Sequence, residues 1–478
     1  MTRLYEPKPY QPLMTNFILD NPRCALWVPM GFGKSVATAT AMDALLMSGE
    51  SGPVLIEAPL RVARTTWPEE FTKWEHLAGY DVVPIIGSEE DRRRALNTDA
   101  QFYTANYETL PWLVDYLGER WPFKTFIADE STKLKSLRVS EQTSSKGNKF
   151  IRGQGGSRAK ALSMIAHTKI KRFIELTGTF ASNGLADTWG QMWFLDKGAR
   201  LGKSFTDFSK RWFTKGYDGW SIEAREYAQE QIQELIRDIV LALEVKDWFD
   251  IDDPIVNDVF VDLGRSARTL YKQMEKDYFI KIENHEIEAF NAASKSMKLL
   301  QIANGAAYLD PEVEDDDNPK ARAWREVHDE KLQALESVFN EAYGETFLIA
   351  YHFKSDAARI LKRFKDARVI ETEQDEADFK KGRIKKALVH PQSIGHGVDG
   401  FQNVCNRIVY FSQNWDLDLY QQLIERIGPV RQAQAGRDVP VYVTRILARD
   451  TIDEDVIERL DTKASVQSIL KKAVKRRR

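Results

Sequence analysis

A glycine-rich turn near the N-terminus has the residue types of a phosphate-binding loop. Residues 31–35 (GFGKS) follow the apolar run 25–28 and precede a helical stretch at 36–47. A strand that turns through glycines into a helix points several backbone N–H groups at one spot, with the positive end of the helix dipole behind them. Lys34 would place a positive charge on the β- and γ-phosphates, and the hydroxyl of Ser35 would bind Mg²⁺. The alternative is an ordinary turn, because the first glycine of the longer phosphate-loop pattern is absent.

Two adjacent carboxylates end a later apolar run. Asp129 and Glu130 directly follow residues 126–128 (FIA), and α/β sheets bind ligands at the carboxyl ends of their strands. Asp129 could hold the hydration shell of Mg²⁺, and Glu130 could orient and deprotonate an attacking water. An isolated acidic pair would more often cap the next helix. The order along the chain favours the chemical interpretation, because another apolar run then leads into residues 177–179 (TGT).

The C-terminal half contains a second glycine-rich turn, residues 395–400 (GHGVDG). Its small residues stand where a backbone must approach something closely, and the turn would open a helix or loop. An ordinary surface turn has the same composition. His390 and His396 lack cysteine or carboxylate partners at metal-ligand spacing, so we reject a zinc site here.

A helical stretch that carries an arginine follows that turn. Gln422 and Arg426 are four residues apart and would share one helix face, and an arginine delivered onto a γ-phosphate stabilises the charge that develops there. Pro429 cannot continue a helix undisturbed. We expect the break to carry Arg431 into the same site. The alternative is that Arg431 is a surface residue and Arg426 acts alone.

These residues need parallel sheets to hold them, and short apolar runs alternate with helical stretches along the whole chain. We expect strands at 24–28, 54–58, 101–104, 125–128 and 172–176 in the first half, and at 346–351, 387–390, 407–411 and 439–446 in the second. Amphipathic helical patterns occupy 222–245 and 267–307. We therefore expect α/β lobes at 1–185 and 331–478, separated by a helical insertion at 186–330.

Composition limits the remaining possibilities. The 478 residues carry a formal net charge of −3, so any nucleic-acid surface must be local. Cys24 and Cys405 have the setting of small core residues in a reducing compartment. The sequence lacks a membrane-length apolar run and begins with polar residues, so we expect a cytoplasmic protein. Residues 139–158 are typical of a mobile loop, 310–318 of an acidic linker and 471–478 of a basic tail.

Taken in order, these motifs resemble those of superfamily-two helicases and translocases, within them the Swi/Snf-like group, and especially its short phage and bacterial members. Tyr10-Gln11 is similar to the adenine-reading glutamine motif. Residues 58–61 with 67–74, and residues 104–108, are similar to the first and second strand-contacting motifs. Residues 129–135 (DESTKLK) and 176–183 (LTGTFASN) are similar to the Asp-Glu-x-His box and to the coupling motif. The chain departs from the family at Thr132, where His is usual, and at Phe180, where Pro is usual.

The resemblance implies two RecA-like lobes that bind ATP and Mg²⁺. It implies catalytic roles for Lys34, Glu130, Arg426 and Arg431, and metal binding by Ser35 and Asp129. Nucleotide contacts are expected from Gln11, Gly31, Phe32, Gly33, Lys34, Ser35, Gly397 and Asp399. Coupling of hydrolysis to movement is expected from Thr132, Thr177, Gly178, Thr179 and Gln422. Candidates for gripping a nucleic-acid backbone are Arg61, Asn106, Lys146, Lys149, Arg152, Arg158 and Lys354, although simple solvation is the alternative for each basic one.

The function implied is an ATP-driven DNA helicase or duplex DNA translocase acting in replication, recombination or repair, in the host cytoplasm if the gene is phage-encoded. One alternative is an RNA helicase of the same fold. Another is the motor subunit of a restriction or recombination complex, with a nuclease or replication protein as its partner. A third is a nucleic-acid-binding protein with a decayed motor, against which the intact Lys34, Asp129, Glu130 and Arg426 argue.

Overall fold

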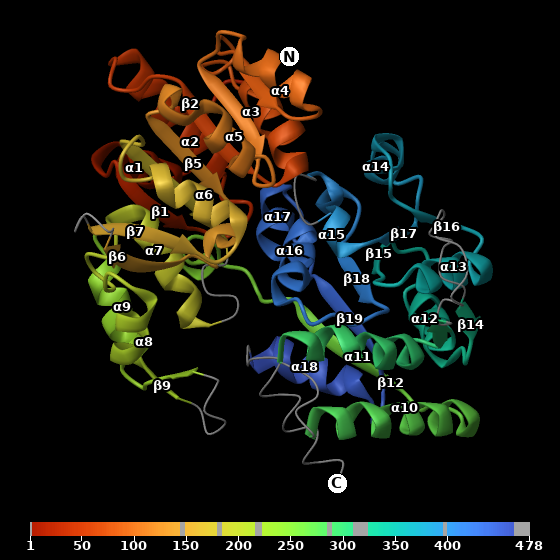
Figure 1. The fold of residues 1–478 in the computed structure, drawn as a ribbon. Coiled ribbons are helices and arrows are strands. Elements are labelled where there is room, and N and C mark those ends of the chain that lie inside the picture. The colour runs from red at the N-terminus through yellow and green to blue at the C-terminus, as the bar shows by residue number, and fades with distance from the viewer. Residues whose placement is uncertain are drawn as a thin grey trace. The chain divides into compact units, whose positions relative to one another are not determined.

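The computed structural model describes residues 2–143, 149–178, 184–215, 222–283, 289–308, 324–394 and 399–462. By its internal contacts the chain divides into two compact units, Met1–Asp250 and Ile251–Arg478. Each unit contains its own parallel β-sheet covered by helices (Figure 1). The predicted α/β class with two parallel sheets is therefore confirmed.

The first unit is built on a seven-stranded sheet in the order β11-β1-β8-β5-β2-β4-β3, in which every neighbouring pair is parallel. Its central strands are buried almost throughout, as expected for a parallel sheet covered on both faces. The strands are β1 (Arg23–Trp27), β2 (Val54–Ala58), β3 (Val82–Ile85), β4 (Phe102–Asn106), β5 (Thr125–Asp129), β8 (Arg172–Thr177) and β11 (Val240–Ala242).

One face of this sheet packs on α5, α6 and α7, whose apolar side chains share a core with alternate residues of the strands. Helices α1 and α2 pack on each other near the start of β1. The helices of the unit are α1 (Gln11–Asp20), α2 (Lys34–Met47), α3 (Trp67–Lys73), α4 (Glu89–Leu96), α5 (Leu110–Leu117), α6 (Ser157–Ile165), α7 (Thr188–Asp196), α8 (Phe205–Trp212) and α9 (Ala228–Ile236).

The second unit is built on a six-stranded parallel sheet in the order β12-β19-β18-β15-β17-β16. Its strands are β12 (Ile255–Val261), β15 (Phe347–Ala350), β16 (Ala367–Val369), β17 (Lys386–Val389), β18 (Arg407–Tyr410) and β19 (Tyr442–Ala448). Its helices are α10 (Arg265–Glu283), α11 (Ala289–Ala303), α12 (Glu330–Glu341), α13 (Lys354–Arg363), α14 (Glu373–Lys380), α15 (Pro391–Ile394), α16 (Leu417–Ile427), α17 (Pro429–Gln434) and α18 (Ile452–Thr462). A short antiparallel pair, β13 (Ala306–Tyr308) and β14 (Trp324–Glu326), completes the unit.

The segment expected to be a mobile loop is an ordered hairpin where the structure describes it. Strands β6 (Arg138–Thr143) and β7 (Lys149–Gln154) pair antiparallel, and α6 begins three residues later. The prediction of a loop was wrong for these residues, because their β-branched and aromatic residues outweigh the Gly and Ser content. Lys146 lies outside the described residues.

The stretch 222–245 was predicted as one amphipathic helix, and this was also wrong. Only α9 is helical. It is preceded by β10 (Ile222–Ala224), which pairs with β9 (Phe213–Lys215), and followed by β11, which joins the seven-stranded sheet. Residues 186–330, expected as a helical insertion, thus contribute β11 to the sheet of the first unit and β12 to that of the second.

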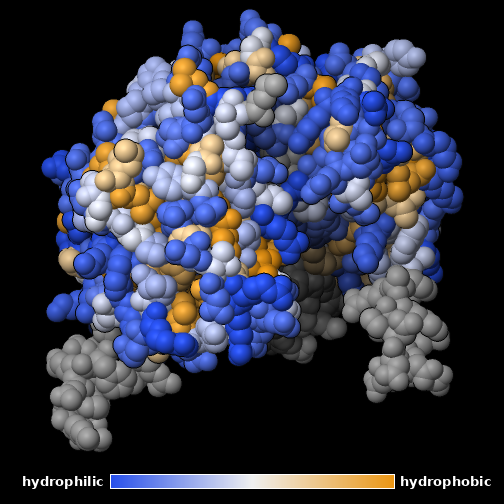
Figure 2. Space-filling model, turned by 90° about the horizontal axis from the view of Figure 1, so that it is seen from above, coloured by the Kyte–Doolittle hydropathy of each residue, from blue (hydrophilic) through white to orange (hydrophobic). Residues whose placement is uncertain are grey.

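Hydrophilic side chains dominate the face seen in Figure 2, and apolar ones form small scattered groups. None of the helices in the described part of the chain is both long and apolar enough to span a membrane. Cys24 and Cys405 are both buried and unpaired with each other, as predicted for core cysteines.

Candidate active site

The loop between β1 and α2 has the predicted strand–turn–helix geometry. Gly31 and Gly33 have φ angles of 87° and 74°, a left-handed conformation that glycine adopts without strain. Gly33 caps α2, which begins at Lys34. The first N–H groups of a helix lack partners within it, and the helix dipole is positive at this end. The loop therefore ends at a favourable site for an anion, with Lys34 and Ser35 in the first turn.

The side chain of Gln11 packs against this loop and hydrogen-bonds to it. The side chain is buried; its Nε2 donates to the Phe32 carbonyl (3.3 Å), and its Oε1 accepts from the Lys8 N–H (2.8 Å) and the Tyr5 hydroxyl (3.2 Å). A Cβ atom built on Gly33 would lie 2.3 Å from Gln11 Nε2. The predicted nucleotide-contact residue thus touches the phosphate loop itself.

An aromatic cluster that we did not predict anchors the loop. Phe32 is fully buried, with its ring centroid 4.6 Å from that of Tyr10 and 5.5 Å from that of Phe249. Tyr10 also meets Trp248 edge-on at 5.6 Å. Phe32 is therefore a core residue that holds the loop in shape. Its partners at 248–249 lie far along the chain, so local pattern could not reveal them.

Lys34 and the coupling motif meet at the carboxyl end of β1. The ammonium of Lys34 donates to the carbonyls of Val28 (2.6 Å) and Pro29 (3.2 Å). Thr177 is the register partner of the last residue of β1, and its carbonyl accepts from the Val28 N–H (3.0 Å). Gly178 faces the loop at Met30, which a Cβ on the glycine would approach to 3.6 Å. Thr177 and Gly178 are thus joined directly to the phosphate loop, whereas Thr179 and Phe180 lie outside the described residues.

Asp129 ends β5, beside β8. Its Oδ2 accepts from the indole N–H of Trp67 (2.9 Å), and its backbone carbonyl accepts from the hydroxyl of Tyr107 (2.9 Å). Burial raises the pKa of Asp129, while the Trp67 hydrogen bond and the positive charge of Lys34 act to lower it. The carboxylate is thus held in place and lies within electrostatic reach of the phosphate-loop lysine.

Glu130 has a strained backbone. Its φ of 62° is left-handed, which costs a non-glycine residue about 1–2 kcal/mol, and such strain is concentrated at functional sites. The side chain makes no capping hydrogen bond to the short 3₁₀-helix Ser131–Leu134 that follows. Helix capping, the alternative role for an Asp-Glu pair, is therefore not what this side chain does.

The remaining residues of the segment 129–135, called the acid box below, pack against α7 and the turn before it. Ser131 shares a hydrogen bond of 2.9 Å with Gln191, and Lys135 forms an ion pair of 3.1 Å with Asp187. A Cβ on Gly190 would lie 2.5 Å from the Lys135 carbonyl, so only glycine allows this approach. Thr132 is nearly buried in the same turn. The turn that carries Thr132 is therefore rigidly attached to the helix after the coupling motif.

The predicted nucleic-acid contacts of the first unit lie in different surroundings. Arg61 stands in the first turn of the helix that leads to Trp67. Asn106 is almost fully buried and used internally, because its amide donates to Glu108 (2.8 Å) and accepts from the Thr109 hydroxyl (2.8 Å). Arg158 forms an ion pair with Glu108 (2.6 Å). Lys149 and Arg152 belong to β7, where the structure describes the backbone alone.

The predicted helix break in the second unit is confirmed. Helix α16 carries Gln422 and Arg426, both nearly buried, and ends at Ile427; α17 begins at Pro429. Arg431 forms an ion pair with Asp399, and the arginine side chain is only 13% exposed. The structure thus brings two predicted site residues, Arg431 and Asp399, into direct contact. Gly397 lies outside the described residues.

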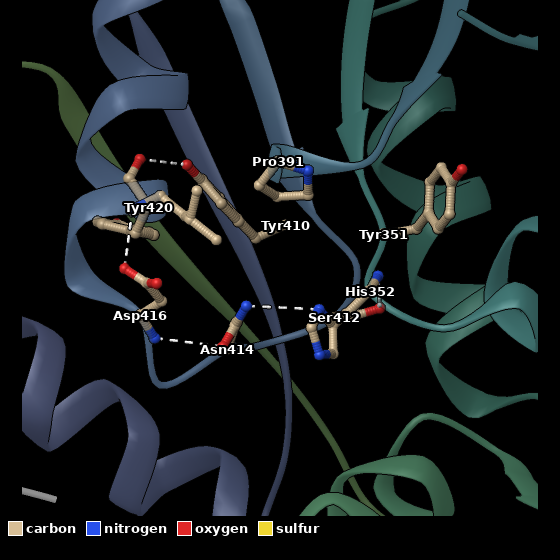
Figure 3. A pocket seen from close by; sticks show the side chains of 9 residues that line it. Tyr351, His352, Pro391, Tyr410, Ser412, Asn414, Asp416 and Tyr420 are labelled. Atoms are coloured by element: carbon tan, nitrogen blue, oxygen red, sulfur yellow. Dashed lines mark hydrogen bonds between the residues drawn. The ribbon is translucent and has the colours of Figure 1, made fainter. Parts of the chain in front are cut away.

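A pocket that we did not predict opens at the carboxyl ends of β15, β17 and β18 (Figure 3). The rings of His352 and His390 stack at its edge with centroids 5.5 Å apart, and the Asn414 amide lies 3.4 Å from His352 Nδ1. Burial lowers the pKa of His352 to about 4, so the ring is neutral at pH 7. Lys354 starts α13 two residues further on. The pocket is lined by Tyr351, His352, Pro391, Tyr410, Ser412, Asn414, Asp416, Leu419 and Tyr420.

The family model of the SNF2-related domain matches residues 20–309. This chain belongs to the SNF2-related family. Membership in this ATPase family makes the chain an ATP-hydrolysing enzyme and confirms the family predicted from the motifs. A relative from Acyrthosiphon pisum secondary endosymbiont phage 1, putative protein p41, is 46% identical over 99% of this chain and 100% of its own length.

One further protein and two solved structures are more distantly similar. Helicase SWR1 of Mycosarcoma maydis is 26% identical over 35% of this chain and 8% of its own length. The Sulfolobus solfataricus SWI2/SNF2 ATPase core in complex with dsDNA shares 20% identity, with a TM-score of 0.44 and coverage of 96% of this chain and 93% of that one. The same core domain alone shares 18% identity, with a TM-score of 0.41, over 97% and 91%.

Proposed function

We propose that this protein is a motor that couples ATP hydrolysis to movement along duplex DNA. The observation that carries the proposal is the meeting of Lys34, Asp129 and Glu130 at the carboxyl edge of one sheet, with Thr177 and Gly178 joined to the phosphate loop. Perturbed ionisable groups gathered at the carboxyl edge of a parallel sheet are typical of catalytic and ligand-binding sites. The family provides the reaction, and this arrangement supports the residue assignments.

In this proposal the triphosphate lies on the turn formed by residues 31–35, where Lys34 and the first N–H groups of α2 neutralise the β- and γ-phosphates. Gln11 and Phe32 keep the turn in shape. Glu130 orients the attacking water and takes its proton, so a new bond forms from water oxygen to the γ-phosphorus while the bond to the β-phosphate oxygen breaks.

The residues fit Mg²⁺. Ser35 and Asp129 offer a hydroxyl and a carboxylate oxygen, which are hard ligands of the kind this ion prefers. Among the described residues, no group of three His, Cys, Asp or Glu side chains could hold a metal ion alone. A site of one carboxylate and one hydroxyl suits an ion held partly by substrate phosphates. When bound, the ion would neutralise charge on the β- and γ-phosphates.

The second unit supplies the remaining groups of the proposal. We assign Arg426 and Arg431 to stabilising the γ-phosphate as charge develops on it, and Gln422 to coupling. The Asp399–Arg431 ion pair would hold the arginine until the phosphate competes for it. Lys354, two residues after the pocket residue His352, and Arg61 are the candidate contacts to the DNA backbone.

The test is an ATPase assay with duplex DNA, single-stranded DNA and RNA, followed by triplex displacement and fork unwinding on whichever stimulates. We expect duplex DNA to stimulate most and triplex displacement to depend on ATP. Stimulation by RNA alone would favour the RNA helicase instead. ATP hydrolysis that no nucleic acid changes, with no strand displaced, would contradict the motor.

A further inference from the structure

A continuous helix follows β2, and one of its side chains contacts the acid box. It runs from Leu60 to Lys73, and its middle, Val62–Thr66, is a π-helix. The Trp67 backbone N–H accordingly bonds to the carbonyl of Val62, five residues earlier. Single π-turns inside α-helices are rare and are frequent at functional sites.

This π-turn decides where Trp67 points. A π-turn contains one residue more than an α-turn, and each residue of an α-helix rotates the chain by about 100°. Without the extra residue, Trp67 would face a different direction. The turn is held from the neighbouring strand, because the buried hydroxyl of Thr104 in β4 donates to the Ala63 carbonyl (2.6 Å).

The indole of Trp67 hydrogen-bonds to Asp129, the carboxylate that the proposed function assigns to metal binding. Trp67 is 1% exposed, and its Nε1 lies 2.9 Å from Asp129 Oδ2. An indole N–H can only donate, so this bond restrains the position of one carboxylate oxygen. Partners that orient a metal ligand typically change metal affinity or activity by 10–100-fold when removed.

We propose that Trp67 is a positioning residue for the metal-binding carboxylate of Asp129, and that the helix from Leu60 to Lys73 links a DNA contact at Arg61 to that carboxylate. The inference rests on the proposed function. The sequence resemblance gave this segment one role, contact with the nucleic-acid strand. The hydrogen bond gives it a second, since a shift of the helix on binding DNA would move the Trp67 N–H and with it the oxygen that the metal needs.

The alternative is that Trp67 is only a core side chain, packed near Phe71 with ring centroids 6.5 Å apart. Trp67→Phe separates the two roles, because it keeps an aromatic ring and removes the N–H. Trp121→Phe is the matched control. Trp121 is a nearly buried indole of the same unit, and its Nε1 donates to the Phe123 carbonyl at the same distance of 2.9 Å, away from the acid box.

The experiment measures Mn²⁺ affinity by electron paramagnetic resonance in the presence of a non-hydrolysable ATP analogue, and the Mg²⁺ dependence of ATP hydrolysis with and without duplex DNA. We expect Trp67→Phe to weaken Mn²⁺ binding by about 10–100-fold, to raise the Mg²⁺ requirement by a similar factor and to lose most of the DNA stimulation. Trp121→Phe keeps wild-type metal affinity. Wild-type Mn²⁺ affinity in folded Trp67→Phe would overturn the proposal.

If Trp67→Phe does not fold, replacement of Trp67 by 3-benzothienylalanine keeps the shape of the indole without its N–H, and the same shift in Mn²⁺ affinity is expected. An unchanged affinity would again overturn the proposal. Failure of the proposed function is distinguishable, because it would show in the wild-type protein as an ATPase that nucleic acid does not stimulate, whatever the metal affinity of the variants.

Discussion

Two glutamates are buried in the centre of the seven-stranded sheet. Glu57 of β2 and Glu175 of β8 are register partners of Ala128 on either side, one residue before Asp129. Both are 0% exposed, and among the described residues none of their carboxylate oxygens has a hydrogen-bond partner. Burial, with a smaller contribution from the charge of Glu108, raises the pKa of Glu57 to about 8. Burial also holds the pKa of Glu175 well above its ordinary value.

The raised pKa makes stability depend on pH. Below the ordinary glutamate pKa of 4.5 the carboxyl of Glu57 is protonated in both states. Between 4.5 and about 8 the folded protein keeps a proton that the unfolded chain has lost, so the free energy of unfolding falls by about 1.4 kcal/mol per pH unit. From pH 5 to pH 8 this single group therefore removes about 4 kcal/mol of stability.

Glu57→Gln removes the titration and keeps the shape of the side chain. The assay is denaturant unfolding between pH 5 and pH 8, following the transition of the first unit. We expect the variant to gain about 4 kcal/mol relative to wild type between these pH values. The test is the slope of the free energy of unfolding against pH. Burying the glutamine amide of the variant changes that free energy by the same amount at every pH, so it does not affect the slope. Glu119→Gln, at a side chain 98% exposed, is the control and should leave the slope unchanged. Parallel pH profiles for wild type and Glu57→Gln would refute the reasoning.

Three further predictions concern the proposed site. Gly33→Ala should weaken binding of a fluorescent ATP analogue by at least about tenfold, because φ is 74° and the new Cβ would lie 2.3 Å from Gln11 Nε2; wild-type affinity would contradict this. Arg431→Ala should lower kcat by about a thousandfold with little change in ATP affinity. A surface role for Arg431 predicts unchanged turnover instead. Asp399→Asn should keep most of the activity. Lys354→Ala should weaken duplex binding and reduce the slope of log affinity against log salt by about one, and an unchanged slope would exclude this contact.

Local pattern predicted the parts of the fold in which local and tertiary preferences agree. Every strand expected from an apolar run is present, including those that end at Asp129 and Thr177. The loop glycines 31 and 33 adopt the left-handed angles that their pattern requires. The break at Pro429 follows from the chemistry of proline alone. These features were predictable because each depends on residues adjacent in the chain.

Other features depend on partners distant in sequence. The π-turn before Trp67 has no signature in residues 62–66, and the indole's partner lies sixty-two residues later, at Asp129. Strand β11 has only three residues, and its parallel pairing with β1 identifies it as a strand where local pattern does not.

The central claim is that one ATP site, built from the turn at 31–35 and the pair Asp129-Glu130, drives the motor. The most direct test is steady-state ATP hydrolysis, with and without duplex DNA, by wild type, Lys34→Ala and Glu130→Gln. The exposed residues Lys124→Ala and Glu119→Gln serve as controls. The account predicts DNA-stimulated hydrolysis in wild type and both controls, and its loss in Lys34→Ala and Glu130→Gln. Wild-type hydrolysis by both site variants would contradict it.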